Sequence, residues 1–265
     1  MITHAKRVQS FESFRQEEVS ALVKSISSNQ GSPVNLSKKI FSLTYRITSR
    51  AAFGNKTDKI LQGIINEHRA SLESEIIGEE AKEDLVTVLL KIQQLGGLEF
   101  PLTEKEIKAI IWDIFSGGSE TSSTSVDWAM TEMVRNLRLL KKAQNEVRQV
   151  CHGKGDVDEA RRDPKHWSEA ETFYPERFLY SSSDFKGTGL EYIPFGAGRR
   201  ICPGILFALS NIELPLAKLL YHFDWELPNG VRHEDLDMTE AFSVTVSRKD
   251  DLILIPTNHT NESTE

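Results

Sequence analysis

The sequence predicts a mostly α-helical protein with one long central helix and a small residual β hairpin. Apolar residues recur at helical spacing through most of the chain, and only two short runs near the C-terminus have a β-like composition. Apolar residues make up 39% of the 265 residues, which is enough for a packed core. We therefore predict one globular, mainly helical domain over residues 1–265.

Four helices are predicted before the central one, over residues 10–26, 36–53, 60–77 and 83–92. The first has apolar side chains that recur at helical spacing, at Phe11, Phe14, Val19, Leu22, Val23 and Ile26. Turn-forming residues separate these segments. Residues 29–33 break the chain after the first helix, and Gly54-Asn55 is expected to end the second.

The strongest helix signal follows Pro101. Thr103 stands three residues before Glu106, which is the spacing of a capping box, where the two side chains bond each other's backbone amides. An apolar face comes next, formed by Ile107, Ile110, Ile111, Ile114 and Phe115. The pattern predicts a helix that continues past two glycines to Arg135, and then an amphipathic helix over residues 139–150.

Beyond Gly153 the helical periodicity fades, and it returns only near the C-terminus. Residues 155–204 are rich in turn signals, which predicts an ordered meander. Residues 205–223 show helical spacing again. Pro215 lies inside this helix and has no amide hydrogen, so we expect a kink or the loss of one backbone hydrogen bond.

The β-like runs lie in the C-terminal segment. Residues 242–246 and 252–255 are predicted to pair as a hairpin around Arg248-Lys249-Asp250. Residues 258–265 are polar and are predicted to form a frayed tail.

Charge and cysteine content narrow the class of function. The formal net charge is −7, which argues against general nucleic-acid binding. Two cysteines in a chain of this length make no disulfide framework, and a reducing compartment is the simpler interpretation. The N-terminus shows no signal peptide, and no run of eighteen apolar residues predicts a membrane span.

The second cysteine lies in a glycine- and arginine-rich loop, Phe195-Gly196-Ala197-Gly198-Arg199-Arg200-Ile201-Cys202-Pro203-Gly204. Its glycines permit tight turns, and Pro203 suits the first turn of the helix that follows. Cys202 would thus stand at a helix N-terminus, where free N–H groups stabilise a thiolate. The alternative is a buried free cysteine in a glycine-rich turn.

This loop resembles the signature of the haem-thiolate monooxygenases, the cytochromes P-450, at every fixed position of Phe-x-x-Gly-x-Arg-x-Cys-x-Gly. The resemblance implies a partial cytochrome P-450 fold and a haem cofactor whose iron is ligated by Cys202. It also implies that Arg200 faces a haem propionate and that Phe195 lies against the haem. Gly196, Gly198 and Gly204 would complete the cofactor-binding loop.

A second motif lies within the predicted central helix, at Gly117-Gly118-Ser119-Glu120-Thr121-Ser122. Glycines inside a helix cost about 1 kcal/mol each relative to alanine, so they indicate a kink or the close approach of a ligand. In the family this motif faces the iron, and the helix opens into an oxygen groove. By resemblance, Thr121 would hydrogen-bond the reacting oxygen and Glu120 would relay protons. A helix break with a surface Glu–Thr pair is the alternative.

The resemblance also implies residues that contact substrate. Ala109, Asp113 and Gly117 would contribute from the central helix, and Phe242 would contribute from the C-terminal segment.

A third motif, Phe173-Tyr174-Pro175-Glu176-Arg177-Phe178, resembles the Pro-Glu-Arg-Phe box of the family. There the box arginine pairs with a Glu-x-x-Arg helix, and the triad supports the cysteine loop. No convincing partner helix stands between Cys151 and Pro175, so Arg177 is expected to have lost its charge partners. We therefore suspect deletion junctions near residues 159–163 and near residues 56–59, and we expect an incomplete domain.

The resemblance covers nearly all of the chain and is strongest to plant enzymes that oxidise terpenoids and related metabolites. It implies a monooxygenase that inserts one atom of O₂ into an apolar small molecule, with electrons from NADPH through a reductase. Lys141, Lys142 and Arg148 are candidates for docking that reductase, against the alternative of a solvated helix face. The family works on the cytoplasmic face of the endoplasmic reticulum membrane. This chain, without the N-terminal anchor, is expected to be soluble.

Two rival interpretations remain open. The chain is either a truncated, non-catalytic family product that binds haem weakly or not at all, or a helical domain with a structural role and no cofactor. The missing triad partner and pocket roof motivate the first.

Overall fold

The computed structural model describes residues 5–53, 61–73, 84–96, 102–151, 194–242 and 245–259. The chain divides into two compact units, one formed by Met1–Val157 with Leu206–Glu265 and the other by Asp158–Ile205. Each unit is described by itself. The incomplete single domain expected from the sequence stays a prediction.

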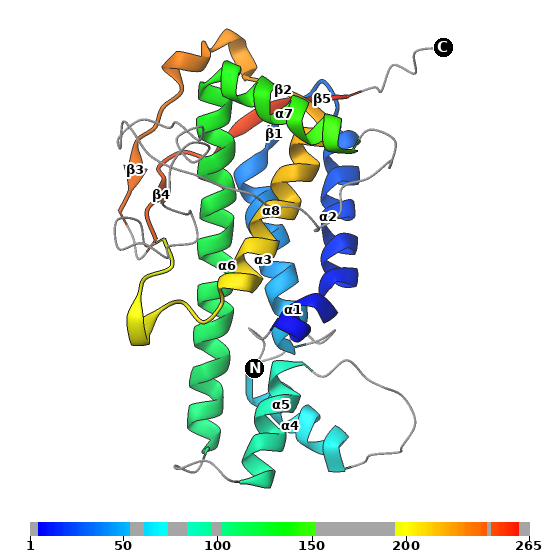
Figure 1. The fold of residues 1–265 in the computed structure, drawn as a ribbon, viewed down its shortest axis with the longest axis vertical. Coiled ribbons are helices and arrows are strands. Elements are labelled where there is room, and N and C mark those ends of the chain that lie inside the picture. Colours follow the sequence, from blue (N-terminus) through cyan, green and yellow to red (C-terminus); the bar gives the residue numbers. More distant parts are fainter. Residues whose placement is uncertain are drawn as a thin grey trace. The chain divides into compact units, whose positions relative to one another are not determined.

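Helices dominate the first unit, as predicted (Figure 1). The helices that precede the central one are α1 (Ala5–Ser10), α2 (Glu12–Ser27), α3 (Leu36–Phe53), α4 (Leu61–Glu73) and α5 (Leu85–Leu95). The central helix α6 spans Glu104–Arg135 and is followed by α7 (Leu137–Cys151) and α8 (Ile205–His222). Every helix predicted from the sequence is confirmed within a few residues where the structure describes it; residues 60, 74–77 and 83 of the predictions lie outside the described part of the chain, and α1 was not predicted.

The start of α6 is fixed by the predicted capping box. The Thr103 hydroxyl accepts the Glu106 amide, and the Glu106 carboxylate accepts the Thr103 amide at 2.6 Å. Each bond satisfies an amide that a helix start leaves without a partner. At the other end, the Asn136 amide bonds the carbonyls of Glu132 and Met133, so α6 ends at Arg135 as predicted.

The core of this unit centres on α3 and α6, which lie side by side in Figure 1. The facing apolar side chains are fully buried, namely Ile40, Leu43, Ile47, Ile107, Ile111, Val126 and Met130. Burial of a side chain of this size stabilises a fold by about 1.5–3 kcal/mol. This packing makes α6 a rigid support for the residues on its opposite face.

A buried ion pair joins α4 to the start of α5. His68 Nε2 lies 2.7 Å from Asp84 Oδ2, and His68 Nδ1 lies 2.7 Å from the Ile64 carbonyl oxygen. Asp84 also caps α5 by accepting the Thr87 amide at 2.9 Å. Because both oxygens beside the imidazole are acceptors, both ring nitrogens must donate, and His68 is therefore positively charged.

The predicted C-terminal hairpin is wrong in its pairing. β5 (Ile253–Asn258) pairs antiparallel with β1 (Val34–Asn35) and β2 (Phe223–Glu226) in a sheet of order β1-β5-β2. The small hairpin consists instead of β3 (Glu240–Ala241) and β4 (Ser247–Arg248). Short apolar runs indicate strands but leave the partner open, and burial against distant segments decided it here.

β5 also reaches into the predicted polar tail. Its last residue, Asn258, is paired with Phe223, and the amide of His259 bonds the His222 carbonyl at 2.8 Å. Residues 260–265 lie outside the described part of the chain. Short 3₁₀ turns occur at Gly198–Arg200, Pro228–Gly230 and His233–Asp235.

Within the described residues, no helix has the length and apolar character that a bilayer crossing needs. The location at the endoplasmic reticulum that the resemblance implies stays a prediction.

Candidate functional site

The cysteine loop belongs to the unit Asp158–Ile205. The Cys202 amide donates to the Phe195 carbonyl at 2.8 Å, which closes the loop on itself. The Gly204 amide lies 3.3 Å from Cys202 Sγ and donates to it. The sulfur is partly exposed and sits three residues before the first residue of α8. The loop therefore gives the sulfur a backbone hydrogen-bond donor at the point where α8 begins.

Two glycines hold the loop in a conformation that other residues rarely adopt. Gly196 has φ +73° and Gly198 has φ +69°. A side chain at either position would be strained. The turn that follows, Gly198–Arg200, leaves Arg199 and Arg200 exposed to solvent.

These residues fit an iron porphyrin. Cys202 offers a partly exposed thiol with a backbone donor and would hold the iron of a haem, as cysteine does in haem–thiolate proteins. Exposed Arg200 lies two residues from the sulfur in sequence, where a cation can pair with a propionate. Phe195, Gly196 and Gly204 are partly buried around the same turn.

Four residues of α6 form a row along one open face of that helix. Ala109, Asp113, Gly117 and Thr121 follow each other at intervals of four, so they lie nearly above one another, and all four are exposed. The Thr121 hydroxyl donates to the Gly117 carbonyl one turn earlier. Glu120 is half-buried beside the row. We call these four residues the open row; α6 is continuous through them.

The two glycines of the α6 motif have different surroundings. A Cβ on Gly118 would stand 3.2 Å from Thr48 Cγ2 of α3 and 3.4 Å from Phe207 Cε1 of α8. A Cβ on Gly117 would meet nothing within 4 Å. Gly118 therefore lets three helices approach, whereas Gly117 keeps the open row free of side-chain bulk.

Phe242 stands alone. Its side chain is 99% exposed, just after β3. The hairpin itself is held to α6 by a hydrogen bond from Trp128 Nε1 to the Val246 carbonyl at 3.0 Å. The hairpin is thus anchored on α6, and Phe242 is exposed to solvent at its edge.

The open row and the cysteine loop fall in separate units, so each is described without the other. Arg177 and the suspected junctions near 56–59 and 159–163 lie outside the described residues. Their roles stay predictions.

Arg148 is engaged within the fold and is a poor candidate for docking a reductase. Its guanidinium donates to the carbonyls of Tyr221 and Phe223 and pairs with Asp224 at 3.0 Å, and its side chain is 14% exposed. Arg148 therefore ties α7 to the junction of α8 and β2.

A buried polar pair, Arg15 with Asn211, was not predicted from the sequence. Both are fully buried, and Arg15 Nε donates to Asn211 Oδ1 at 3.1 Å. A usable signal existed. Arg15 stands four residues from both Phe11 and Val19, so a charge occupies the middle of the apolar face of α2.

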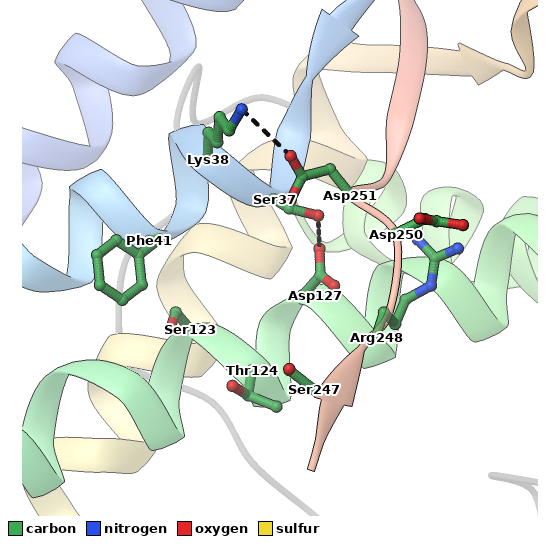
Figure 2. A pocket seen from close by; sticks show the side chains of 10 residues that line it. All are labelled: Ser37, Lys38, Phe41, Ser123, Thr124, Asp127, Ser247, Arg248, Asp250 and Asp251. Carbon is green, nitrogen blue, oxygen red and sulfur yellow. Dashed lines mark hydrogen bonds and ion pairs between the residues drawn. The ribbon is translucent and has the colours of Figure 1, made fainter. Parts of the chain in front are cut away.

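A polar cleft with a volume of about 260 Å³ is formed by the start of α3, the second half of α6 and the segment from β4 to β5 (Figure 2). It is lined by Ser37, Lys38, Phe41, Ser123, Thr124, Asp127, Ser247, Arg248, Asp250 and Asp251. Ser37 links three of these segments. Its hydroxyl donates to Asp127 Oδ1 at 2.6 Å and accepts the Leu252 amide at 2.7 Å.

Asp127 gives a pH-dependent prediction. Burial raises the pKa of its carboxyl above the usual 3.8, against the opposing effects of the Ser37 hydrogen bond and the Arg248 charge. The folded state therefore binds this proton more tightly than the unfolded chain. This tighter proton binding stabilises the folded state fully below pH 3.8. The stabilisation is lost as pH rises through the raised pKa of the folded state.

Asp127→Asn keeps an oxygen for Ser37 and removes the buried charge. We expect a higher melting temperature than wild type at pH 7 and no difference near pH 3, measured by circular dichroism. Asp250→Asn, on an exposed side chain, is the control, and its melting temperature should equal that of wild type at both pH values. A lower melting temperature for Asp127→Asn at pH 7 would contradict the upward shift of the Asp127 pKa.

Comparison with known proteins agrees with the geometry of the loop. The family model described as Cytochrome P-450 matches residues 55–161 and 157–254. Tabersonine 6,7-epoxidase isoform 1 of Catharanthus roseus is 41% identical over 97% of this chain and 71% of its own length. Desmethyl-deoxy-podophyllotoxin synthase of Sinopodophyllum hexandrum is 39% identical, over 96% of this chain and 70% of its own length. Melianol synthase of Citrus sinensis is 40% identical, over 95% of this chain and 70% of its own length.

The length of these alignments exceeds the length of this chain. The match to the epoxidase extends over 359 residues, against 265 in the whole chain. The relative therefore has residues within the aligned span that have no counterpart here.

Proposed function

This chain belongs to the cytochrome P-450 family, and from that premise we propose that it inserts one atom of O₂ into an apolar, terpenoid-like molecule, with NADPH electrons delivered by a reductase. The observation that carries the proposal is the cysteine loop. Cys202 Sγ accepts the Gly204 amide at the entrance to α8, inside a loop that only glycines at 196 and 198 allow. The plant relative named as an epoxidase supports the insertion of oxygen into a small molecule.

Cys202 would hold the haem iron, and Arg200 would pair with a propionate. When bound, the haem supplies the activation of O₂, and its thiolate ligand donates electron density toward the metal. The chain's part is to present the sulfur. The Gly204 amide donates to Sγ at the start of α8, and the Phe195 carbonyl fixes the Cys202 backbone.

The open row would face the substrate. Ala109 and Gly117 offer small surfaces to an apolar molecule, and Thr121 places a hydroxyl at the end of the row. In the structure this hydroxyl donates to the Gly117 carbonyl and keeps its lone pairs free to accept a proton donor. Glu120, half-buried at the preceding position, is proposed to relay protons toward the reaction site.

Thr121→Val tests this role. Proton transfer by a positioned group contributes about 10²- to 10⁴-fold to a rate. We expect product formation, measured with reductase and NADPH, to fall about 10²-fold, since valine keeps the shape and loses the hydroxyl. Ser125→Ala is the matched control, because Ser125 is exposed one turn later and bonds the Thr121 carbonyl in the same way. Unchanged product formation in Thr121→Val would contradict the assignment.

A truncated, non-catalytic product is the second candidate, and two observations favour it. Relatives carry residues within the aligned span that this chain lacks, and large apolar side chains stand uncovered, with Trp112 61% exposed and Phe242 99% exposed. Product from any terpenoid with reductase would exclude this candidate. Stoichiometric haem after purification would exclude a purely structural helical domain.

A further inference from the structure

Two side-chain contacts of the same spacing connect α2 with the first half of α8. Phe11 packs edge-on against Phe207, with ring centroids 6.3 Å apart and planes at 86°. One turn later on both helices, Arg15 Nε donates to Asn211 Oδ1 at 3.1 Å. Phe11 and Arg15 are four residues apart, as are Phe207 and Asn211, so each helix presents one face to the other.

The second contact is held deep in the unit. Arg15 and Asn211 are both 0% exposed. Arg15 Nη2 also donates to the Val8 carbonyl at 3.1 Å, so the guanidinium is tied to α1 as well as to α8. A buried guanidinium must satisfy its donors in a fixed geometry, and this makes the contact directional in a way that apolar packing is not.

The Phe207 ring also reaches α6. A Cβ on Gly118 would come within 3.4 Å of Phe207 Cε1, so the ring lies against the α6 backbone at this point. The first two turns of α8 therefore touch α2 through Phe207 and Asn211, and α6 through Phe207. They begin three residues after Cys202.

We propose that Arg15, through its hydrogen bond to Asn211, is a positioning residue that fixes the first two turns of α8, the helix that continues the chain after Cys202. This inference rests on the proposed function for its link to haem. The hold on α8 is a property of the polypeptide alone. Phe11 and Phe207 supply contact area, whereas Arg15 sets the register of α8 along α2.

A merely structural role makes a different prediction. Replacing buried charged groups by well-packed apolar residues is often neutral for stability. Arg15→Met fills a similar volume and removes the directional bonds. If Arg15 only filled space, this variant would leave the dynamics at the start of α8 unchanged.

Hydrogen exchange of the haem-free chain, followed by mass spectrometry, tests the hold directly. We expect Arg15→Met to speed exchange of the amides of residues 206–211 at least tenfold and to leave residues 218–222 unchanged. Arg15→Lys, which keeps a donor, should recover part of the protection. Arg46→Met is the matched control, because Arg46 is 47% exposed and pairs with Glu18 at 3.1 Å, and it should match wild type. Wild-type exchange at residues 206–211 in Arg15→Met overturns the proposal.

Should Arg15→Met fail to fold, Asn211→Leu removes the same bond from the other side and decides the question. The haem-loaded chain gives the second readout, taken where the far-ultraviolet spectra of variant and wild type coincide. We expect Arg15→Met to lower the fraction of reduced, CO-bound protein that shows the thiolate band by at least half. An unchanged fraction overturns the link to Cys202. If wild type shows no such band, the proposed function fails, and the exchange experiment still decides the hold on α8.

Discussion

Asp84→Ala is expected to lower the free energy of unfolding by about 3–5 kcal/mol, the cost of breaking a buried charge pair by removing one partner. The substitution leaves the charged His68 without its carboxylate and takes the N-cap from α5. Both side chains are largely buried, 8% and 11% exposed, so water cannot replace the lost partner. Urea unfolding followed by circular dichroism measures the loss.

Asp84→Asn separates the two roles, because asparagine caps a helix as well as aspartate does. We expect it to keep the cap, lose the pair and fall between wild type and Asp84→Ala. Wild-type stability in Asp84→Ala would contradict the charged state of His68.

The same pair predicts acid sensitivity. Burial alone would raise the pKa of Asp84, but hydrogen bonds from His68 and from the Thr87 amide outweigh it and hold the pKa below the usual 3.8. The stability from Asp84 is therefore complete above pH 3.8 and is lost as pH falls through the folded pKa. The stability gap between wild type and Asp84→Asn should narrow on going from pH 5 to pH 2.

Gly118→Val should lower the free energy of unfolding by about 2 kcal/mol or more. A Cβ there already meets Thr48 at 3.2 Å and Phe207 at 3.4 Å, and valine adds two methyl groups to a tight junction. The matched change is Gly117→Ala, where nothing lies within 4 Å and alanine gains about 1 kcal/mol of helix propensity. In urea unfolding, we expect the free energy of unfolding to fall for Gly118→Val and to rise for Gly117→Ala. Equal changes would contradict the close packing of Gly118 against Thr48 and Phe207.

The helices were predictable because each has its own local signals. The bounds of α3 match the prediction at both ends, and the Thr103 and Glu106 capping box fixed the start of α6. Strand pairing was not predictable in the same way. β5 takes β1 and β2 as partners, segments that lie far along the chain, and no local pattern near Leu252 specifies them.

The buried face of α8 also escaped the sequence. This helix is apolar nearly all round, so no stripe marks its inner side. Leu206, apolar in the pattern, is 39% exposed, whereas Lys218 is 2% exposed. Contacts with α2 and α6 select the face, and they depend on the tertiary fold.

The candidate site residues also differ in how far the sequence alone predicts them. Cys202, its glycines and Thr121 lie in contiguous motifs, and such motifs show in a sequence. Arg15 and Asn211 are 196 positions apart, and only the fold joins them. A charge inside an apolar face, as at Arg15, is the one local sign of such a partner.

The central claim is that Cys202 is a haem ligand, and the absorption spectrum of the reduced, carbon-monoxide-bound chain tests it most directly. The chain would be expressed with haem supply beside Cys202→Ala, with Cys151→Ser as the matched cysteine control. The account predicts a Soret band at the red-shifted thiolate position in wild type and in Cys151→Ser, and its loss in Cys202→Ala. A wild-type band at the position of a protonated thiol or histidine ligand, or one that survives in Cys202→Ala, would contradict it.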